Sequence, residues 1–535
     1  MTNFKNKKGE IIESFKYHFG VNCKIDLKKS KELCLNSCEK GNKLARGLSL
    51  YLGWDLEDVP KSLTIFQEII NQSDDKEEMG YAFFCMGFIY QSGANKIEKD
   101  LQKAIHYYEK AVEMNNACAL TNLAIIYSQG GKGVERDLNK ALKLYNQAIE
   151  SNHVKALYGL ALMYQEGKEG VEKDLPRAIQ LYNQAIKLND VDSIFNLALI
   201  YNEERGVKRD IKKAIKLYKQ AIKLKDYRSM HNLGFIYQDG CEIEGVKIKK
   251  NLAKAIKLYK KAIAQKYVGS MINLANIYKE ENDLPQAILL LRKAIKLDCT
   301  CAMIGLAEIY LSEDIETDKK KIQKGIQLYK EAAKRGKTIA MFSLAVIYQY
   351  GFKNEIKIDL NKARKLYEKA VVLGDIKSMV NLAFMIDEKE IDLSIKLYEQ
   401  AIELKDSTAA FNLGLLYHKG IKVEKNCELA IKYWEIASEL DHADAIYNLA
   451  MSYYSGVDGV VKNVSKAIEY LKKGCKLDHP LSLFKLGVIY VYEQGGFEEN
   501  HEQCLLLINR AASLGHQEAI KVAKYLNELL EENSF

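Results

Sequence analysis

Proline is nearly absent from this chain, with four residues in 535. Its scarcity favours a mostly helical protein, because proline lacks a backbone N–H and clashes with the preceding helical turn. No apolar run approaches the ~18 residues that a membrane span needs. The opening residues MTNFKNKKGE lack the apolar core of a secretory signal. We therefore expect no membrane span and a cytoplasmic location, with the nucleus as the open alternative.

The eleven cysteines show no order along the chain. An odd number at irregular positions is typical of reduced thiols rather than of a disulfide framework. Cys34 with Cys38, and Cys299 with Cys301, lack the second cysteine pair or the histidines that a zinc site requires. The sequence therefore predicts no metal site and no cofactor.

Motifs for catalysis are missing as well. Ser37 and Lys40 form an S-x-x-K pattern, but its S-D-N and K-T-G partners do not occur. The chain contains no H-E-x-x-H, no Walker loop and no G-x-G-x-x-G after a strand pattern. We therefore predict a protein that is not an enzyme.

What the chain has instead is a period of roughly 37 residues. Neighbouring copies contain GVERDLNKALKLYNQA (Gly133–Ala148) and GVEKDLPRAIQLYNQA (Gly170–Ala185). Stacked repeats share one continuous core, so the length of the chain does not require separate domains. Twelve regular units begin near Tyr81, Ala117, Val154, Val191, Tyr227, Val268, Thr300, Thr338, Ile376, Ser407, Ala443 and Pro480.

Each unit contains two apolar stripes at helical spacing. In one unit the stripes are Ala119, Leu123, Ile126 and Tyr127, then Ala141, Leu144, Tyr145 and Ala148. An αα-hairpin cannot bury both stripes alone and must stack on its neighbours. We therefore expect an all-α protein, an α-solenoid. Its predicted parts are an N-terminal helical cap at 1–41, a divergent repeat at 42–80, twelve repeats at 81–516 and a C-terminal capping helix at 517–535.

Capping residues mark the start of the second helix of most units. An Asp or Asn side chain there accepts a hydrogen bond from an otherwise unpaired backbone N–H. The predicted caps are Asp58, Asp100, Asp137, Asp174, Asp210, Asn251, Asp283, Asp359, Asn426, Asn463 and Asn500. Pro60, Pro176 and Pro285 follow such caps in the first turn, where a missing N–H costs little. Capping chemistry and the period therefore predict the same hairpin boundaries.

The repeated pattern identifies a family. It reads A-x-x-x-L-A/G-x-x-Y, then a glycine-containing loop ending G-V-x-x-D-x-x-K-A, then I-x-L-Y-x-x-A. This pattern closely resembles the Sel-one-like repeat, a relative of the tetratricopeptide repeat. The resemblance implies a right-handed superhelix of about 12–13 repeats, in which the first helix of each unit lines a concave groove. It also implies an adaptor or scaffold.

Seven units carry an asparagine directly before the leucine of the first helix. They are Asn122, Asn196, Asn232, Asn273, Asn381, Asn412 and Asn448. An amide offers a donor and an acceptor, so this ladder could grip the backbone of an extended peptide, as in related tetratricopeptide superhelices. The alternative is that these asparagines bond the neighbouring repeat or belong to the family pattern. Gly159 interrupts the ladder.

Two other residue types recur at fixed positions. We interpret the first-helix tyrosines as core between repeats: Tyr90, Tyr127, Tyr164, Tyr201, Tyr237, Tyr278, Tyr310, Tyr348, Tyr417, Tyr453 and Tyr490. Four histidines share the last position before a first helix, so we interpret them as turn residues rather than metal ligands: His153, His442, His479 and His516.

Together these features predict a non-catalytic protein–protein interaction scaffold or adaptor that binds a protein or peptide partner in the concave groove. Specificity would come from Thr121, Phe195, His231 and Phe411. The alternatives are an RNA-binding helical-repeat protein and a regulatory subunit that activates an enzyme complex. Lysines crowd the second helices, whereas phosphate binding needs cations in the groove, which disfavours a nucleic-acid partner. The net charge of +8 fits either lysine-rich solvated faces or an acidic partner.

Overall fold

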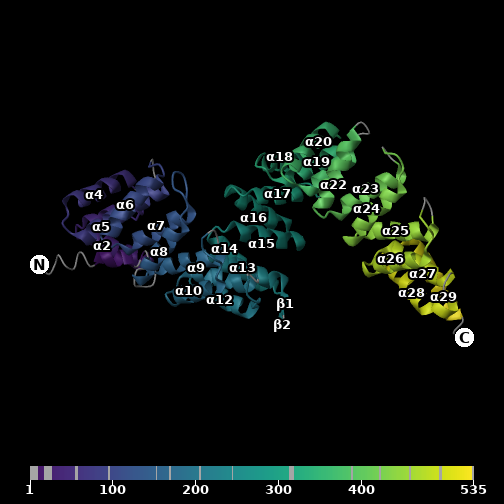
Figure 1. Cartoon of the computed structure of the whole chain (residues 1–535), viewed down its shortest axis with the longest axis horizontal. Helices are drawn as coiled ribbons and strands as arrows, with labels where there is room; N and C mark the ends of the chain where they lie inside the picture. Colours follow the sequence, from purple (N-terminus) through teal and green to yellow (C-terminus); the bar gives the residue numbers. More distant parts are fainter. Residues whose placement is uncertain are drawn as a thin grey trace. The chain divides into compact units, whose positions relative to one another are not determined.

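The computed structural model describes residues 10–16, 18, 27–54, 58–93, 97–151, 153–167, 170–203, 206–243, 245–312, 319–386, 390–420, 423–456, 460–492 and 497–532. Parts of the predicted caps, at 1–9, 17, 19–26 and 533–535, lie outside these ranges. Nearly all of the described chain is helical, and successive helices pair into hairpins that stack on one another (Figure 1). The prediction of an all-α solenoid is confirmed, and the handedness of its superhelix stays a prediction. Contacts divide the chain into two units, Met1–Leu274 and Ala275–Phe535, which are described separately.

The first unit opens with α2 (Leu27–Glu39), α3 (Lys43–Tyr51) and α4 (Val59–Gln72). Hairpins follow, and we call their first helices A and their second helices B. The A helices are α5 (Lys76–Ser92), α7 (Ala117–Gln129), α9 (Val154–Glu166), α11 (Val191–Asn202) and α13 (Tyr227–Asp239). The B helices are α6 (Leu101–Glu113), α8 (Leu138–Glu150), α10 (Leu175–Lys187), α12 (Ile211–Lys223) and α14 (Leu252–Ala264). Consecutive A helices α5, α7 and α9 also pack directly against one another.

One hairpin of the first unit carries an insertion between its helices. There β1 (Cys241–Ile243) pairs antiparallel with β2 (Val246–Ile248), with Glu242 opposite Lys247. Gly245 turns the chain between the strands with a φ of +75°, a conformation that favours glycine.

The second unit continues the same alternation after α15 (Val268–Glu280), which spans the boundary between the units. Its A helices are α17 (Thr300–Tyr310), α19 (Thr338–Tyr350), α21 (Ile376–Met385), α23 (Ser407–Lys419), α25 (Ala443–Ser455) and α27 (Pro480–Tyr492). Its B helices are α16 (Leu284–Lys296), α18 (Lys319–Lys334), α20 (Leu360–Val372), α22 (Ile391–Glu403), α24 (Cys427–Glu439), α26 (Val464–Lys476) and α28 (Phe497–Ser513). The last helix is α29 (Gln517–Glu532).

The helix starts follow the capping signals closely. The A helices from α7 to α27 begin at the unit starts expected from the period. However, α5 begins at Lys76, upstream of Tyr81, because the Asp75 side chain accepts from the N–H groups of Glu77 and Glu78. The predicted B-helix caps from Asp58 to Asn463 all accept a first-turn N–H. Asn500 lies inside α28, so the prediction of a cap there is wrong.

The aromatic core between repeats comes more from the B helices than from the A helices. The buried B-helix tyrosines are Tyr108, Tyr145, Tyr182, Tyr218, Tyr259, Tyr329, Tyr367 and Tyr398. Of the A-helix series that we predicted as core, only Tyr164, Tyr310 and Tyr490 are buried, and the others are half-buried. A cation of the B helix covers several of these outer rings. Lys140, for example, places Nζ 4.0 Å from the centroid of Tyr127.

The described residues contain no disulfide, no cluster of metal ligands and no helix that could span a membrane. Their cysteines are free thiols. No group of three or more His, Cys, Asp or Glu side chains among them could hold a metal ion. None of their helices combines the length and the apolar character needed to cross a bilayer.

Candidate functional site

A hollow of about 600 Å³ lies on the A-helix side of the first unit. Its walls come from A helices of four successive hairpins, α5, α7, α9 and α11, together with α8, the neighbouring loops and His18 near the N-terminus. Ile125 of α7 and Leu162 of α9 line it, together with the rings of Tyr145 and Tyr158. The lining is mostly apolar with a few polar groups, which is the composition typical of ligand pockets of this size.

Gly159 of α9 shapes the floor of this hollow. It occupies the position that Asn122 holds one repeat earlier. A Cβ atom at Gly159 would lie 2.5 Å from Cε1 of the Tyr145 ring, so only glycine lets that ring pack so closely against α9. The interruption of the asparagine ladder therefore coincides with the hollow.

His153 stands at the N-terminal end of α9, in the same wall. Its Nδ1 lies 2.8 Å from Thr121 Oγ1, and its side chain gives α9 no capping bond. The residue is only 3% exposed, and its Nε2 has no hydrogen-bond partner among the described residues. Burial, assisted by the charge of Lys155, lowers the pKa of His153 to about 4. The imidazole is therefore neutral at pH 7.

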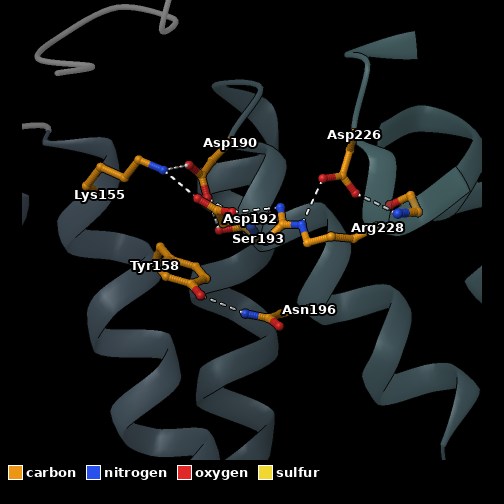
Figure 2. A network of polar contacts seen from close by, with 9 residues as sticks. Lys155, Tyr158, Asp190, Asp192, Ser193, Asn196, Asp226 and Arg228 are labelled. Carbon is orange, nitrogen blue, oxygen red and sulfur yellow. Dashed lines mark hydrogen bonds and ion pairs between the residues drawn. The ribbon is translucent and has the colours of Figure 1, made fainter. Parts of the chain in front are cut away.

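A network of ion pairs joins the starts of three consecutive A helices beside the hollow (Figure 2). Lys155 of α9 places Nζ 3.1 Å from Asp190 Oδ1 and 2.7 Å from Asp192 Oδ2. Arg228 of α13 binds Asp192 through Nη2 at 2.8 Å and Asp226 through Nε at 2.9 Å. Asp192 thus bridges two cations, and three carboxylates face two positive charges.

The network keeps its members charged. Burial alone would raise the pKa of Asp192, but Lys155 and Arg228 outweigh it and hold that pKa below its ordinary value. Burial would likewise lower the pKa of Lys155, but Asp190 and Asp192 outweigh it and raise that pKa. Asp190 also caps α11, because its Oδ2 accepts from the N–H and the hydroxyl of Ser193. These bonds set the spacing of α9, α11 and α13.

Four of the seven predicted asparagines donate a hydrogen bond to a tyrosine hydroxyl. Asn122 bonds Tyr108 at 2.8 Å, and Asn232 bonds Tyr218 at 3.3 Å, in each case a B-helix tyrosine of the preceding hairpin. The other two contacts are Asn273 with Tyr259 at 3.2 Å and Asn196 with the A-helix residue Tyr158 at 3.0 Å (Figure 2). The amide of this position therefore satisfies a buried or half-buried hydroxyl between repeats.

The other three asparagines behave differently. Asn381 donates to the backbone oxygen of Lys377 in its own helix, at 2.9 Å. Asn412 is half-buried, and Asn448 lines a separate hollow of about 440 Å³ in the second unit, near Trp434. The structure thus does not bring the seven amides into one uniform row of contacts. Peptide binding by these residues stays a prediction.

We did not predict from the sequence the side chains that accept a hydrogen bond from the hydroxyls of the buried tyrosines. The hydroxyl of Tyr108 donates to Gln91 Oε1 at 2.6 Å, and that of Tyr259 donates to Gln238 Oε1 at 2.8 Å. Each glutamine directly follows an A-helix tyrosine, so a recurring Tyr-Gln pair was the available signal. The ion pairs of Asp192 had no such signal, because they do not recur along the array.

The histidines at the turn position pack against the A helix before them. His442 stacks on Phe411 and His516 stacks on Phe484, each with ring centroids 4.6 Å apart. Nδ1 of His516 accepts from the backbone N–H of Ala519 at 3.1 Å. His442 and His516 therefore combine a helix cap with a ring contact, in keeping with their interpretation as turn residues.

Comparison with protein families finds a match to the family described as Sel1 repeat. It covers residues 85–116, 119–153, 154–190, 191–226, 228–267, 302–337, 338–375, 381–406, 407–442, 443–479 and 480–516, more than half of the chain. The hairpin of α15 and α16 falls between two matched segments. Among curated proteins, no relative matches.

Solved structures include several similar repeat proteins. The protective antigen c5321 of uropathogenic Escherichia coli strains, which displays an SLR fold, is 22% identical, with a TM-score of 0.48, over 87% of this chain and 97% of that chain. A Sel1 repeat protein from Oxalobacter formigenes is 24% identical, with a TM-score of 0.39, over 47% and 96%. The immunity protein Pa5087 from Pseudomonas aeruginosa is 22% identical, with a TM-score of 0.29, over 41% and 83%.

Proposed function

Because this chain belongs to the Sel1 repeat family, we propose that it is a protein-interaction scaffold that binds a protein or peptide partner on the A-helix side of its first unit. Proteins of this family generally serve as interaction scaffolds. In this proposal the partner binds on the A-helix side, and the chain itself catalyses no reaction.

The observation that carries the proposal is the hollow of about 600 Å³ between α7 and α9. Partners are held best where an apolar pocket is surrounded by a small number of oriented polar groups. The ion pairs of Asp192 hold α9, α11 and α13 in place beside it, so the site is largely formed before a partner arrives. The predicted asparagine ladder would contribute amide oxygens to the backbone of a bound peptide.

Charge favours a protein partner over RNA. Two cations line the hollow, Lys155 and Arg136; Lys155 is paired with carboxylates, as is the neighbouring Arg228, which leaves Arg136 as a single cation there. Binding of a nucleic acid needs cations that are free to neutralise phosphates. The three carboxylates of the network would instead repel a phosphate backbone.

Selection of peptides on the full chain tests this proposal. A phage-displayed library of random peptides would be selected on the immobilised protein, and the affinities of the enriched peptides measured by titration. Tyr158→Ala should weaken them by about tenfold or more. The matched control is Phe342→Ala, because Phe342 holds the same position in α19 of the second unit, is also half-buried, and also lies beside a B-helix tyrosine.

Two results would contradict the proposal. The first is equal weakening by Tyr158→Ala and Phe342→Ala, which would place binding elsewhere or trace the loss to stability. The second is tighter binding of a single-stranded RNA oligonucleotide than of any selected peptide, with an affinity that falls steeply as salt is raised.

A further inference from the structure

The hollow extends along α9 as well as across the neighbouring repeats. Its lining includes Lys155 in the first turn of α9 and Glu166 at the last residue of that helix. At a rise of 1.5 Å per residue, these positions are about 16 Å apart along the helix axis. An extended chain covers that distance with about five residues. The slot therefore has the length of a short peptide segment lying parallel to α9.

The middle of this slot is apolar, and its formal charges stand near the ends. Tyr158 and Leu162 lie one turn apart on α9, and Ile125 lies on the wall formed by α7. Lys155 and Asp192 stand at one end, and Glu166 is at the other end of the helix. Arg136 lines the hollow from the loop beside the C-terminal end of α7. This distribution matches an occupant with an apolar centre and polar flanks.

A charged group has no counter-ion in the middle of the slot. Lys155 and Asp192 are already paired with each other. His153 is neutral at pH 7 because burial lowers the pKa of its imidazole. Burial of an unpaired charge is costly, so the centre selects a neutral side chain.

The walls also favour an aromatic side chain over an aliphatic one. They present the rings of Phe84, Tyr145 and Tyr158, together with the thioether of Met163. Aromatic rings pack edge-to-face or offset against one another, and methionine sulfur makes favourable contacts with ring edges. The hydroxyl of Tyr158 accepts from Asn196 and can still donate its own proton to a polar atom of the occupant.

We propose that this slot is the anchor site for one uncharged aromatic side chain, that of phenylalanine, tyrosine or tryptophan, presented by an extended segment of the protein partner. This inference rests on the proposed function and names the chemistry of the partner. Gly159 distinguishes the site from the two neighbouring repeats, because the equivalent positions in α7 and α11 carry asparagine.

The test uses the full chain and small probes that mimic single residues. N-acetyl-L-tryptophanamide, N-acetyl-L-leucinamide and N-acetyl-L-lysinamide would each be titrated while the methyl group of ¹³C-labelled Met163 is followed by NMR. The tryptophan probe should shift the Met163 resonance through its ring current and bind at least about threefold more tightly than the leucine probe. No shift with the tryptophan probe, or tighter binding of the lysine probe, would overturn the proposal.

Filling the slot provides the second measurement. Leu162→Trp places a ring in the hollow and should weaken the tryptophan probe by about tenfold. The matched control Leu199→Trp changes the equivalent position one repeat later, outside the hollow, and should leave binding unchanged. Ile125→Trp, on the facing helix, is an alternative blocking variant if Leu162→Trp lowers the melting temperature. Equal binding by a folded blocking variant and Leu199→Trp would overturn the proposal.

The outcome separates this inference from the proposed function. Selected peptides that need Tyr158 but contain no shared aromatic residue would overturn the aromatic anchor and leave the scaffold proposal intact. A library that yields no peptide dependent on Tyr158 would overturn both.

Discussion

Acid should weaken the packing of α7 against α9 through a single residue, His153. The imidazole is buried beside Thr121 and near Lys155, and its pKa falls from 6.5 to about 4 on folding. Each pKa unit corresponds to about 1.4 kcal/mol. Protonation of His153 therefore lowers the free energy of unfolding by at most about 3.4 kcal/mol, a value reached when the pH lies below both pKa values.

The sign follows from proton uptake. Between pH 6.5 and about 4, the unfolded chain binds a proton at His153 and the folded chain does not. Stability is therefore fully present above pH 6.5 and falls as the pH drops toward 4. At pH ~4.5 the expected loss is about 2.5 kcal/mol. The group behaves in this way because it is buried neutral and has no anionic partner.

His153→Asn is the informative variant, since Asn116 holds the same position one repeat earlier and caps α7. It removes the titration and can provide the side-chain cap that α9 lacks. Hydrogen exchange of peptides from α7 and α9, corrected for the intrinsic effect of pH, reports the local opening free energy. The wild-type protein should lose about 2.5 kcal/mol relative to the variant between pH ~7 and ~4.5.

Peptides from α19 provide an internal control, because Lys337 rather than a histidine stands at the corresponding turn. They should show the same pH dependence in both proteins. If the curves for α7 and α9 run parallel in wild type and variant, the burial argument for His153 is refuted.

Two further predictions concern stability and are read from thermal unfolding and local exchange. Asn122→Ala should cost about 1 kcal/mol more than Asn381→Ala, because only Asn122 bonds a buried tyrosine hydroxyl across repeats; equal costs would contradict that role. Gly159→Ala and Gly305→Ala occupy the same repeat position but should have opposite signs. At residue 159 the new Cβ would lie 2.5 Å from the Tyr145 ring, and this clash should lower the stability of the protein by about 1–3 kcal/mol. At residue 305 the new Cβ would lie 3.4 Å from Leu291, an ordinary contact, so the higher helix propensity of alanine should raise the stability by about 1 kcal/mol. A stabilised Gly159→Ala protein would refute the argument from packing.

Local chemistry explains why so much of the fold could be predicted. The repeat period and the capping residues act within a few positions of chain, so α7 to α27 begin where the pattern indicates. Asn500 shows the limit of such signals. It has the right residue type at the right spacing, but α28 begins at Phe497 and passes through it. An N-terminal cap is used only where a helix begins, and tertiary packing as well as the local pattern decides that position.

The tyrosines show where periodicity stops being informative. Both helices of a hairpin carry an apolar stripe with a tyrosine, and we interpreted the A-helix tyrosines as core between repeats. The structure buries Tyr108 and Tyr182 of the B helices and leaves Tyr127 half-buried under Lys140. Which stripe faces the next hairpin depends on how the hairpins pack, and both stripes have the same period.

The sequence by itself determined the elements of this protein: helices, their caps, their pairing into hairpins and the family to which they belong. The tertiary structure alone decided the candidate site. In the sequence Gly159 only interrupts the row of asparagines, whereas the structure shows that the Tyr145 ring of α8 packs against this glycine. Lys155, Asp192 and Arg228 belong to three different repeats, and they meet because α9, α11 and α13 stack side by side. A repeat pattern encodes what its copies share, whereas this site is built from residues in which they differ.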